Sequence, residues 1–312
     1  MKKITKLVTV LLFVSLLISG CGALNESETT DKINIVTTNF PPYDFTREIA
    51  GDLADVTMLL SPGQESHTFE PTPQDIIKLE KADIFIIGGG KSDEWARKLS
   101  ENVQNTKLKV LSMMDCVEIL PEETTHHHEE DHSEFYEYDE HVWTSPENAK
   151  KICEEIASFL ISVDLENEAV YKENLNEYKE KLDELDKSFL DVVNESEQSA
   201  IIFGDRFPFR YFADRYGLSY FAAFPGCSGE TEPDAATMKF LIDKTKEEKI
   251  PVIFYTGLSN HKIADAICEV TGAKPMLLHS CHGITKDEFK RGETYLSLMR
   301  KNVDALKEAL YK

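Results

Sequence analysis

The stretch from residue 72 to residue 102, TPQDIIKLEKADIFIIGGGKSDEWARKLSEN, decides the fold class because it holds one complete helix–strand–helix unit. Thr72 precedes a proline at the first helical position and an aspartate three residues on, a pattern typical of a helix N-terminus. A helix to about residue 81, an apolar strand at 83–87 and a second helix from residue 93 follow. This order predicts a parallel sheet with helices on its faces.

The same alternation continues on both sides of this stretch. We predict strands at 33–37, 56–60 and 108–111 with a helix at 42–50, and a second series of strands at 200–203, 219–223, 252–255 and 276–278. Helices at 208–216, 233–248, 260–270 and from 294 onward separate or follow the strands of the second series. The sequence therefore predicts an α/β protein with two lobes, each a mainly parallel sheet flanked by helices.

A long helix is predicted between the two series, at residues 165–197, after an amphipathic helix at 146–163. Its apolar residues recur at alternating spacings of four and three: Tyr171, Leu175, Tyr178, Leu182, Leu185, Phe189 and Val192. A coiled-coil dimer is the alternative, but the seam lacks regular charge pairs beside it. We therefore expect a monomer with lobes at 32–163 and 199–312, joined by a rigid connecting helix at 164–198.

The N-terminal residues have the pattern of an export signal: lysines, an apolar run at 7–18, small residues and then Cys21. The run is too short to be interpreted first as a membrane-spanning helix, although an uncleaved anchor is the alternative. Residues 17–21, LISGC, resemble a bacterial lipobox. This predicts a signal peptide at 1–20, lipidation of Cys21 and a flexible tether at 21–31, and hence an extracytoplasmic, lipid-anchored protein.

Two observations exclude classes of function. The formal net charge is −22, which argues against binding to nucleic acid and is compatible with the capture of cations. Residues 88–92, GGGKS, are similar to a phosphate-binding loop, but Phe85 occupies the position at which that motif requires its first glycine. A glycine-rich turn between a strand and a helix is therefore the better interpretation.

Residues 124–143, TTHHHEEDHSEFYEYDEHVW, hold five of the nine histidines among acidic residues, a composition typical of metal binding. We predict a His-rich acidic loop at 124–140. Four of its histidines are expected either to gather metal weakly or only to be solvated: His126, His127, His128 and His132. His141, at the ordered end of this stretch, is expected to belong to a tight site.

Three histidines occupy the positions where such a site would be built. His67, His141 and His279 each lie after a predicted strand or in a loop between elements. Imidazole is a good ligand for Zn²⁺, which needs only three or four such groups. Taken singly, each histidine is more often a surface or hydrogen-bonded residue, so it is their matching placement that favours a zinc site. No predicted helix carries the His-Glu-x-x-His motif of many zinc hydrolases; its spacing occurs only at residues 128–132, HEEDH, in the acidic stretch without helical periodicity, and we expect no enzyme.

Two motifs resemble a known family. Residues 63–73, GQESHTFEPTP, and 139–143, DEHVW, are similar to the first- and second-ligand motifs of the zinc/manganese ABC-transporter solute-binding lipoproteins. The lipobox, the acidic His-rich loop and the long helix extend the resemblance over essentially the whole mature chain. It implies two α/β lobes, a connecting helix that limits hinge motion, and one metal in the cleft, to be handed to a membrane permease.

The chain departs from this family at the third and fourth ligands. Alignment on Tyr211 puts Arg206 in the third position, and a guanidinium cannot ligate a metal. The fourth position aligns with His279, so His67, His141 and His279 form the expected set. Further ligands that remain open are Asp205, Glu230, water, Cys281 and His282.

Two of the cysteines lie in polar, turn-like segments near these residues. Outside the cytoplasm a disulfide between Cys227 and Cys281 is the first expectation, and ligation of a soft metal by a thiolate is the second. Cys153 and Cys268 lie in helical patterns and are expected in the core. Together these features predict a zinc-binding component of an ABC importer. The alternatives are a manganese-binding counterpart and a surface adhesin that uses metal structurally.

Overall fold

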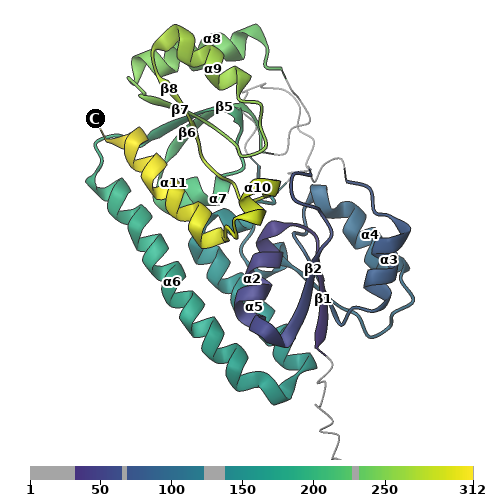
Figure 1. Ribbon diagram of the computed structural model, residues 1–312. Coiled ribbons are helices and arrows are strands. Elements are labelled where there is room, and N and C mark those ends of the chain that lie inside the picture. Colours follow the sequence, from purple (N-terminus) through teal and green to yellow (C-terminus); the bar gives the residue numbers. More distant parts are fainter. Residues whose placement is uncertain (1–31, 65–68, 123–137, 227–231, 312) are drawn as a thin grey trace, which may run out of the picture. The chain divides into compact units, whose positions relative to one another are not determined.

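Two four-stranded parallel sheets organise the chain, of which the computed structural model describes residues 32–64, 69–122, 138–226 and 232–311 (Figure 1). The first sheet has the order β2-β1-β3-β4, and its strands are β1 (Ile33–Thr37), β2 (Ala54–Met58), β3 (Ile84–Ile87) and β4 (Lys109–Ser112). The second has the order β6-β5-β7-β8, from β5 (Ala200–Arg206), β6 (Ser219–Phe224), β7 (Val252–Tyr255) and β8 (Lys274–Leu277). The predicted α/β class is therefore confirmed, and both sheets have the same strand order.

Helices cover both faces of the first sheet. All four residues of β3 are buried, and because side chains alternate along a strand they face opposite sides. Ile84 and Ile86 pack with α2 (Phe40–Ala50) and α5 (Pro146–Val163), whereas Phe85 and Ile87 pack with α3 (Pro73–Glu80) and α4 (Glu94–Asn102). This two-sided burial explains why the strand is apolar throughout.

The start of α3 shows how local chemistry fixes an element. Thr72 is its N-cap, and the Asp75 carboxylate accepts hydrogen bonds from the Thr72 N–H at 2.9 Å and from its hydroxyl at 2.7 Å. This capping box satisfies groups that would otherwise lack a helical partner. The predicted N-terminus at Pro73 is therefore confirmed.

The second sheet is covered in the same way. Helices α8 (Ala235–Glu247) and α9 (Lys262–Thr271) enclose one small core, while α7 (Arg210–Tyr216) and α11 (Tyr295–Leu310) pack on the other face. Gly217 and Gly272 end α7 and α9 in the left-handed conformation, with φ of 65° and 79°. The short helix α10 (Lys286–Lys290), just before α11, was not predicted because five residues are too few for a periodic pattern.

The predicted long helix is α6 (Glu168–Glu195), preceded by the short turn η6 (Leu165–Asn167). It packs against α2, α5 and α11, elements from both halves of the sequence (Figure 1). Its Asp186 accepts two hydrogen bonds from Arg215, at 2.6 and 3.0 Å, and one from the Tyr216 hydroxyl. The apolar seam of α6 is thus buried within the protein's own core, as expected, and one hydrophobic cluster contains residues of both sheets.

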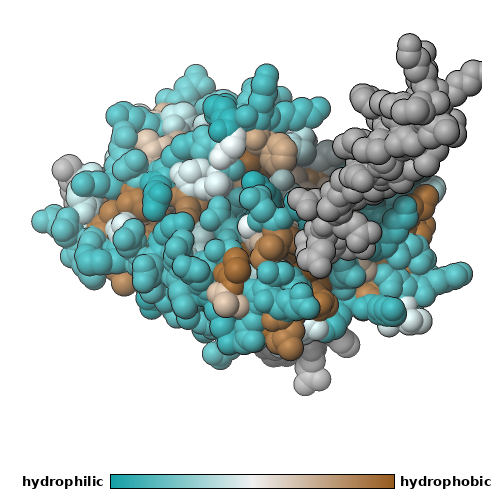
Figure 2. Space-filling model, turned by 60° about the horizontal axis from the view of Figure 1, so that its bottom comes forward, coloured by the Kyte–Doolittle hydropathy of each residue, from teal (hydrophilic) through white to brown (hydrophobic). Residues whose placement is uncertain are grey.

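Hydrophilic residues prevail on the face of the molecule in Figure 2, where hydrophobic residues form separate patches between them. Among the described helices, none has the length and hydrophobicity required to cross a membrane. Residues 1–31, which include the predicted signal peptide and Cys21, lie outside the described part of the chain.

Candidate metal centre

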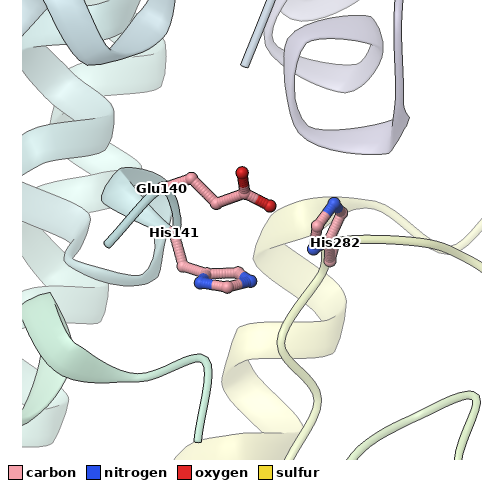
Figure 3. Close-up of side chains that lie close together, drawn as sticks. All are labelled: Glu140, His141 and His282. Carbon is pink, nitrogen blue, oxygen red and sulfur yellow. The ribbon is translucent and has the colours of Figure 1, made fainter. Parts of the chain in front are cut away.

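Three side chains in the described part of the chain form a group that could hold a metal ion: Glu140, His141 and His282. One ligand atom of each lies within 4.8 Å of the others, and the side chains point toward a common space (Figure 3). Glu140 and His141 are almost fully buried and His282 is half-buried. Two imidazoles and a carboxylate together are a donor set that suits a divalent transition metal.

Glu140 and His141 lie just before the short helix η5 (Val142–Thr144), which leads into α5. Asp139 holds this segment in place, because its Oδ1 accepts the His141 N–H at 2.8 Å and faces His141 Nδ1 at 3.1 Å. A proton on Nδ1 would satisfy this second contact and leave Nε2 with its lone pair. Such a carboxylate contact is typical of histidines that ligate metals, since it fixes both the tautomer and the ring orientation.

His282 comes from the other half of the chain, from the loop between β8 and α10. Its ring centroid lies 5.1 Å from that of His141 and 5.2 Å from that of Trp143, in edge-to-face arrangements. Trp143 also donates from Nε1 to the Ser280 carbonyl at 2.8 Å, which ties η5 to this loop. Cys281, directly before His282, has a φ of 59°. This left-handed turn sets the direction in which the His282 side chain leaves the loop.

Glu140 is held on one side only. Its Oε2 accepts the Ser92 N–H at 2.9 Å, whereas Oε1 has no hydrogen-bond partner among the described residues. Burial alone would raise the pKa of Glu140, but the charges of His141 and His282 and the hydrogen bonds from Ser92 outweigh it and lower the pKa to about 2. The carboxylate is therefore ionised at neutral pH, with one oxygen available to a cation.

The environment of His141 favours its charged form. Burial lowers the pKa of His141, but the charge and hydrogen bond of Asp139 and the charge of Glu140 raise it above its ordinary value. Such a site attracts positive charge in general. Because a metal binds neutral imidazole, binding here would displace a proton.

His279, one of the three expected ligands, is not a member of this group. Its Nδ1 accepts the Cys281 N–H at 3.0 Å and its Nε2 faces Glu288 Oε1 at 3.7 Å, so both ring nitrogens are already engaged. Its backbone N–H and carbonyl are bound by the side-chain amide of Asn302 in α11. His279 thus shapes the turn that presents His282, and it is His282 that lies with Glu140 and His141.

Two further expected ligands, Asp205 and Cys281, are not members of this group either. Asp205 Oδ2 accepts hydrogen bonds from the N–H and hydroxyl of Thr256, and its Oδ1 accepts the Arg206 N–H. Cys281 is a free thiol that is fully buried, and burial raises its pKa well above the ordinary value. A protonated, buried thiol is a poor ligand. The free thiol also gives no support to a disulfide with Cys227.

Several sequence predictions fall outside the described residues. They concern His67, Glu230, Cys227 and the loop histidines His126, His127, His128 and His132. Glu140, in contrast, is a member of the candidate group that the sequence reasoning missed. The signal that could have identified it is its position next to His141, in a motif already singled out for metal binding.

A family model and individual relatives of known function point to the same protein family. Residues 35–309 match the ZnuA family, described as zinc-uptake complex component A periplasmic. The zinc-binding lipoprotein AdcA of Streptococcus pneumoniae (strain ATCC BAA-255 / R6) is 32% identical over 312 residues, 99% of this chain and 61% of AdcA. The high-affinity zinc uptake system protein ZnuA of Bacillus subtilis (strain 168) is 31% identical over 303 residues, 95% of this chain and 94% of that protein. The chain thus spans less than two thirds of AdcA.

The fold is also similar to a solved structure. The crystal structure of the Zn(II)-bound ZnuA-like domain of Streptococcus pneumoniae AdcA matches with a TM-score of 0.75 and 31% sequence identity. The match covers 90% of this chain and 100% of that domain. The sequence and structural comparisons therefore agree.

Proposed function

The chain belongs to the family of zinc-uptake complex component A, and from this premise we propose that it is the extracytoplasmic solute-binding component of a zinc ABC importer. In this role it captures Zn²⁺ as cargo and delivers it to a permease in the membrane. The predicted signal peptide and the lipid on Cys21 would keep it at the outer surface of the cytoplasmic membrane. It is a carrier rather than an enzyme.

The observation that carries this proposal is the group of Glu140, His141 and His282. We propose these three residues as zinc ligands, acting through Glu140 Oε1, His141 Nε2 and a ring nitrogen of His282. Bonds of about 2.1 Å in a tetrahedral site place ligand atoms roughly 3.4 Å apart. Since the three ligand atoms lie within 4.8 Å of one another, side-chain adjustments of about an ångström would close the site.

A fourth ligand comes from the predicted set or from solvent. His67 remains our prediction for it, on the strength of the motif at residues 63–73. With two or three imidazoles, the site suits Zn²⁺ better than Mn²⁺, which prefers carboxylate and water oxygens. A manganese-binding counterpart would have a richer set of carboxylates.

We further propose that zinc is bound in the cleft between the lobes. In support, Glu140 and His141 belong to the segment that follows the first sheet, whereas His282 follows β8 of the second. A small movement of one lobe relative to the other would separate the ligands and release the ion. The contact between Trp143 and Ser280 lies beside the site and would break in the same movement.

A competition titration tests the site. The protein without an affinity tag should bind one Zn²⁺ tightly and prefer it to Mn²⁺, and His141→Ala or His282→Ala should each weaken zinc binding by orders of magnitude. His261→Ala is the matched control, because this histidine is exposed and paired with Asp265 at 2.8 Å. Native affinity in both His141→Ala and His282→Ala would refute the assignment.

Growth of a strain that lacks the protein tests transport separately from binding. Poor growth in zinc-depleted medium that excess zinc restores would support the importer. Growth that does not depend on zinc would instead favour the surface adhesin with a structural metal.

A further inference from the structure

The glycine-rich turn at residues 88–90 follows β3 and contributes none of the three candidate ligands. It lies at the carboxyl end of a central strand, where ligand sites of open α/β sheets are built. Gly90 is its point of closest approach to the metal centre: a Cβ atom added there would lie 2.1 Å from Glu140 Oε2 and 2.2 Å from Glu140 Cβ. The Glu140 side chain therefore occupies the space that any other residue at position 90 would fill.

Backbone conformation does not explain the glycine at this position. Gly90 has φ −84° and ψ −166°, an extended conformation that any residue adopts. Its neighbour Gly89 differs, since its φ of 100° favours glycine by itself. At position 90 glycine is required because a larger residue would collide with the side chain of Glu140.

The turn is fixed independently of Glu140. The buried Asp93 carboxylate accepts the Gly88 N–H at 2.6 Å and the Thr38 hydroxyl at 2.7 Å. Arg97 donates to the Gly89 carbonyl at 3.1 Å. From this fixed turn the Ser92 N–H holds Glu140 Oε2, so the opposite oxygen, Oε1, is the one left without a partner among the described residues.

We propose that Gly90 and the Ser92 N–H are positioning groups that seat Glu140 and orient its Oε1 toward the bound metal, and thereby set the affinity for zinc. This inference rests on the proposed function, because it assigns a role to the turn only if Glu140 is a ligand. The glycine-rich turn thus supports a metal ligand 50 residues away in the sequence, where a phosphate-binding role was excluded.

The decisive variant is Gly90→Ala. The added methyl group displaces Glu140, and loss of a group that orients a ligand lowers metal affinity by about 10- to 100-fold. Gly217→Ala is the matched control: its φ of 65° makes alanine strained, but a Cβ there meets no atom of the described residues within 4 Å. It should lower thermal stability and leave zinc affinity unchanged.

A double-mutant cycle separates positioning from general damage. In a Glu140→Gly background the three side-chain atoms nearest to a Cβ at position 90 are removed, so Gly90→Ala should cause no further loss of zinc affinity. The visible absorption of bound Co²⁺, which reports the ligand set, should change in the same way in Gly90→Ala and Glu140→Gly. If Gly90→Ala alone fails to fold, the double variant should fold, and its failure would overturn the proposal.

Two other results would also overturn the proposal. One is native zinc affinity in folded Gly90→Ala, and the other is a further tenfold loss when Gly90→Ala is added to Glu140→Gly. The zinc affinity of His141→Ala tests the proposed metal site separately. Native affinity in this variant would refute the site itself, independently of the result for Gly90→Ala. If His141→Ala loses zinc affinity while Glu140→Gly keeps native affinity, only the positioning role of Gly90 and the Ser92 N–H is refuted.

Discussion

Replacing Asp44 with asparagine should remove a pH-dependent penalty from the folded state. Asp44 lies in α2, is 1% exposed, and accepts the N–H of Tyr295 at the start of α11 at 2.7 Å. Burial raises the pKa of this carboxyl from 3.8 to about 7, against the lowering effect of that hydrogen bond. Asparagine keeps an oxygen for the Tyr295 N–H and carries no charge at any pH.

The direction follows from proton linkage. Because the folded protein holds the Asp44 proton more tightly than the unfolded chain, the contribution of this group to stability is greatest below pH 4 and is lost as the pH rises through about 7. A shift from 3.8 to about 7 corresponds to about 4 kcal/mol at high pH. The stability of Asp44→Asn relative to the native protein should therefore increase by roughly 2.5 kcal/mol between pH 5 and pH 8.

Urea unfolding of both proteins at several pH values measures this difference. Asp304→Asn, an exposed substitution on α11, is the matched control and should follow the native curve at every pH. A stability difference between Asp44→Asn and the native protein that does not change with pH would refute the reasoning, since it would mean that the buried carboxyl titrates as it does in the unfolded chain.

Two further predictions follow from contacts of buried carboxylates. Asp139→Ala removes the partner of His141 Nδ1 and should weaken zinc binding by about 10- to 100-fold in a competition titration, with native affinity as the contrary result. Asp186→Ala removes the bidentate contact with Arg215 and should lower the free energy of unfolding by about 2 kcal/mol in urea. Lys187→Ala breaks only an exposed pair and should cost a few tenths of a kcal/mol; an equal loss in both would contradict the role of Asp186.

Most of the fold could be predicted because its signals are local. The capping box at Thr72, the apolar run of β3 and the spacing of apolar residues along α6 each depend on neighbours in the sequence. The boundaries differ where the signal is weak: β5 continues to Arg206 through a register shift, and α7 begins at Arg210 rather than at residue 208.

The site was harder to predict because its geometry depends on distant residues. His279 and His282 are three residues apart, and nothing local distinguishes them as ligands. The choice rests on Asn302, which binds the backbone of His279, and on the left-handed turn at Cys281. Glu140 depends in turn on a glycine 50 residues earlier, a proximity that only the folded chain creates.

The most direct test of the zinc site is a crystal structure of the zinc-loaded protein with an anomalous difference map recorded at the zinc absorption edge. We predict one strong peak at about 2.0 to 2.2 Å from Glu140 Oε1, His141 Nε2 and a ring nitrogen of His282. A strong peak at His279, or peaks only beside the histidines of residues 126–132, would contradict the account.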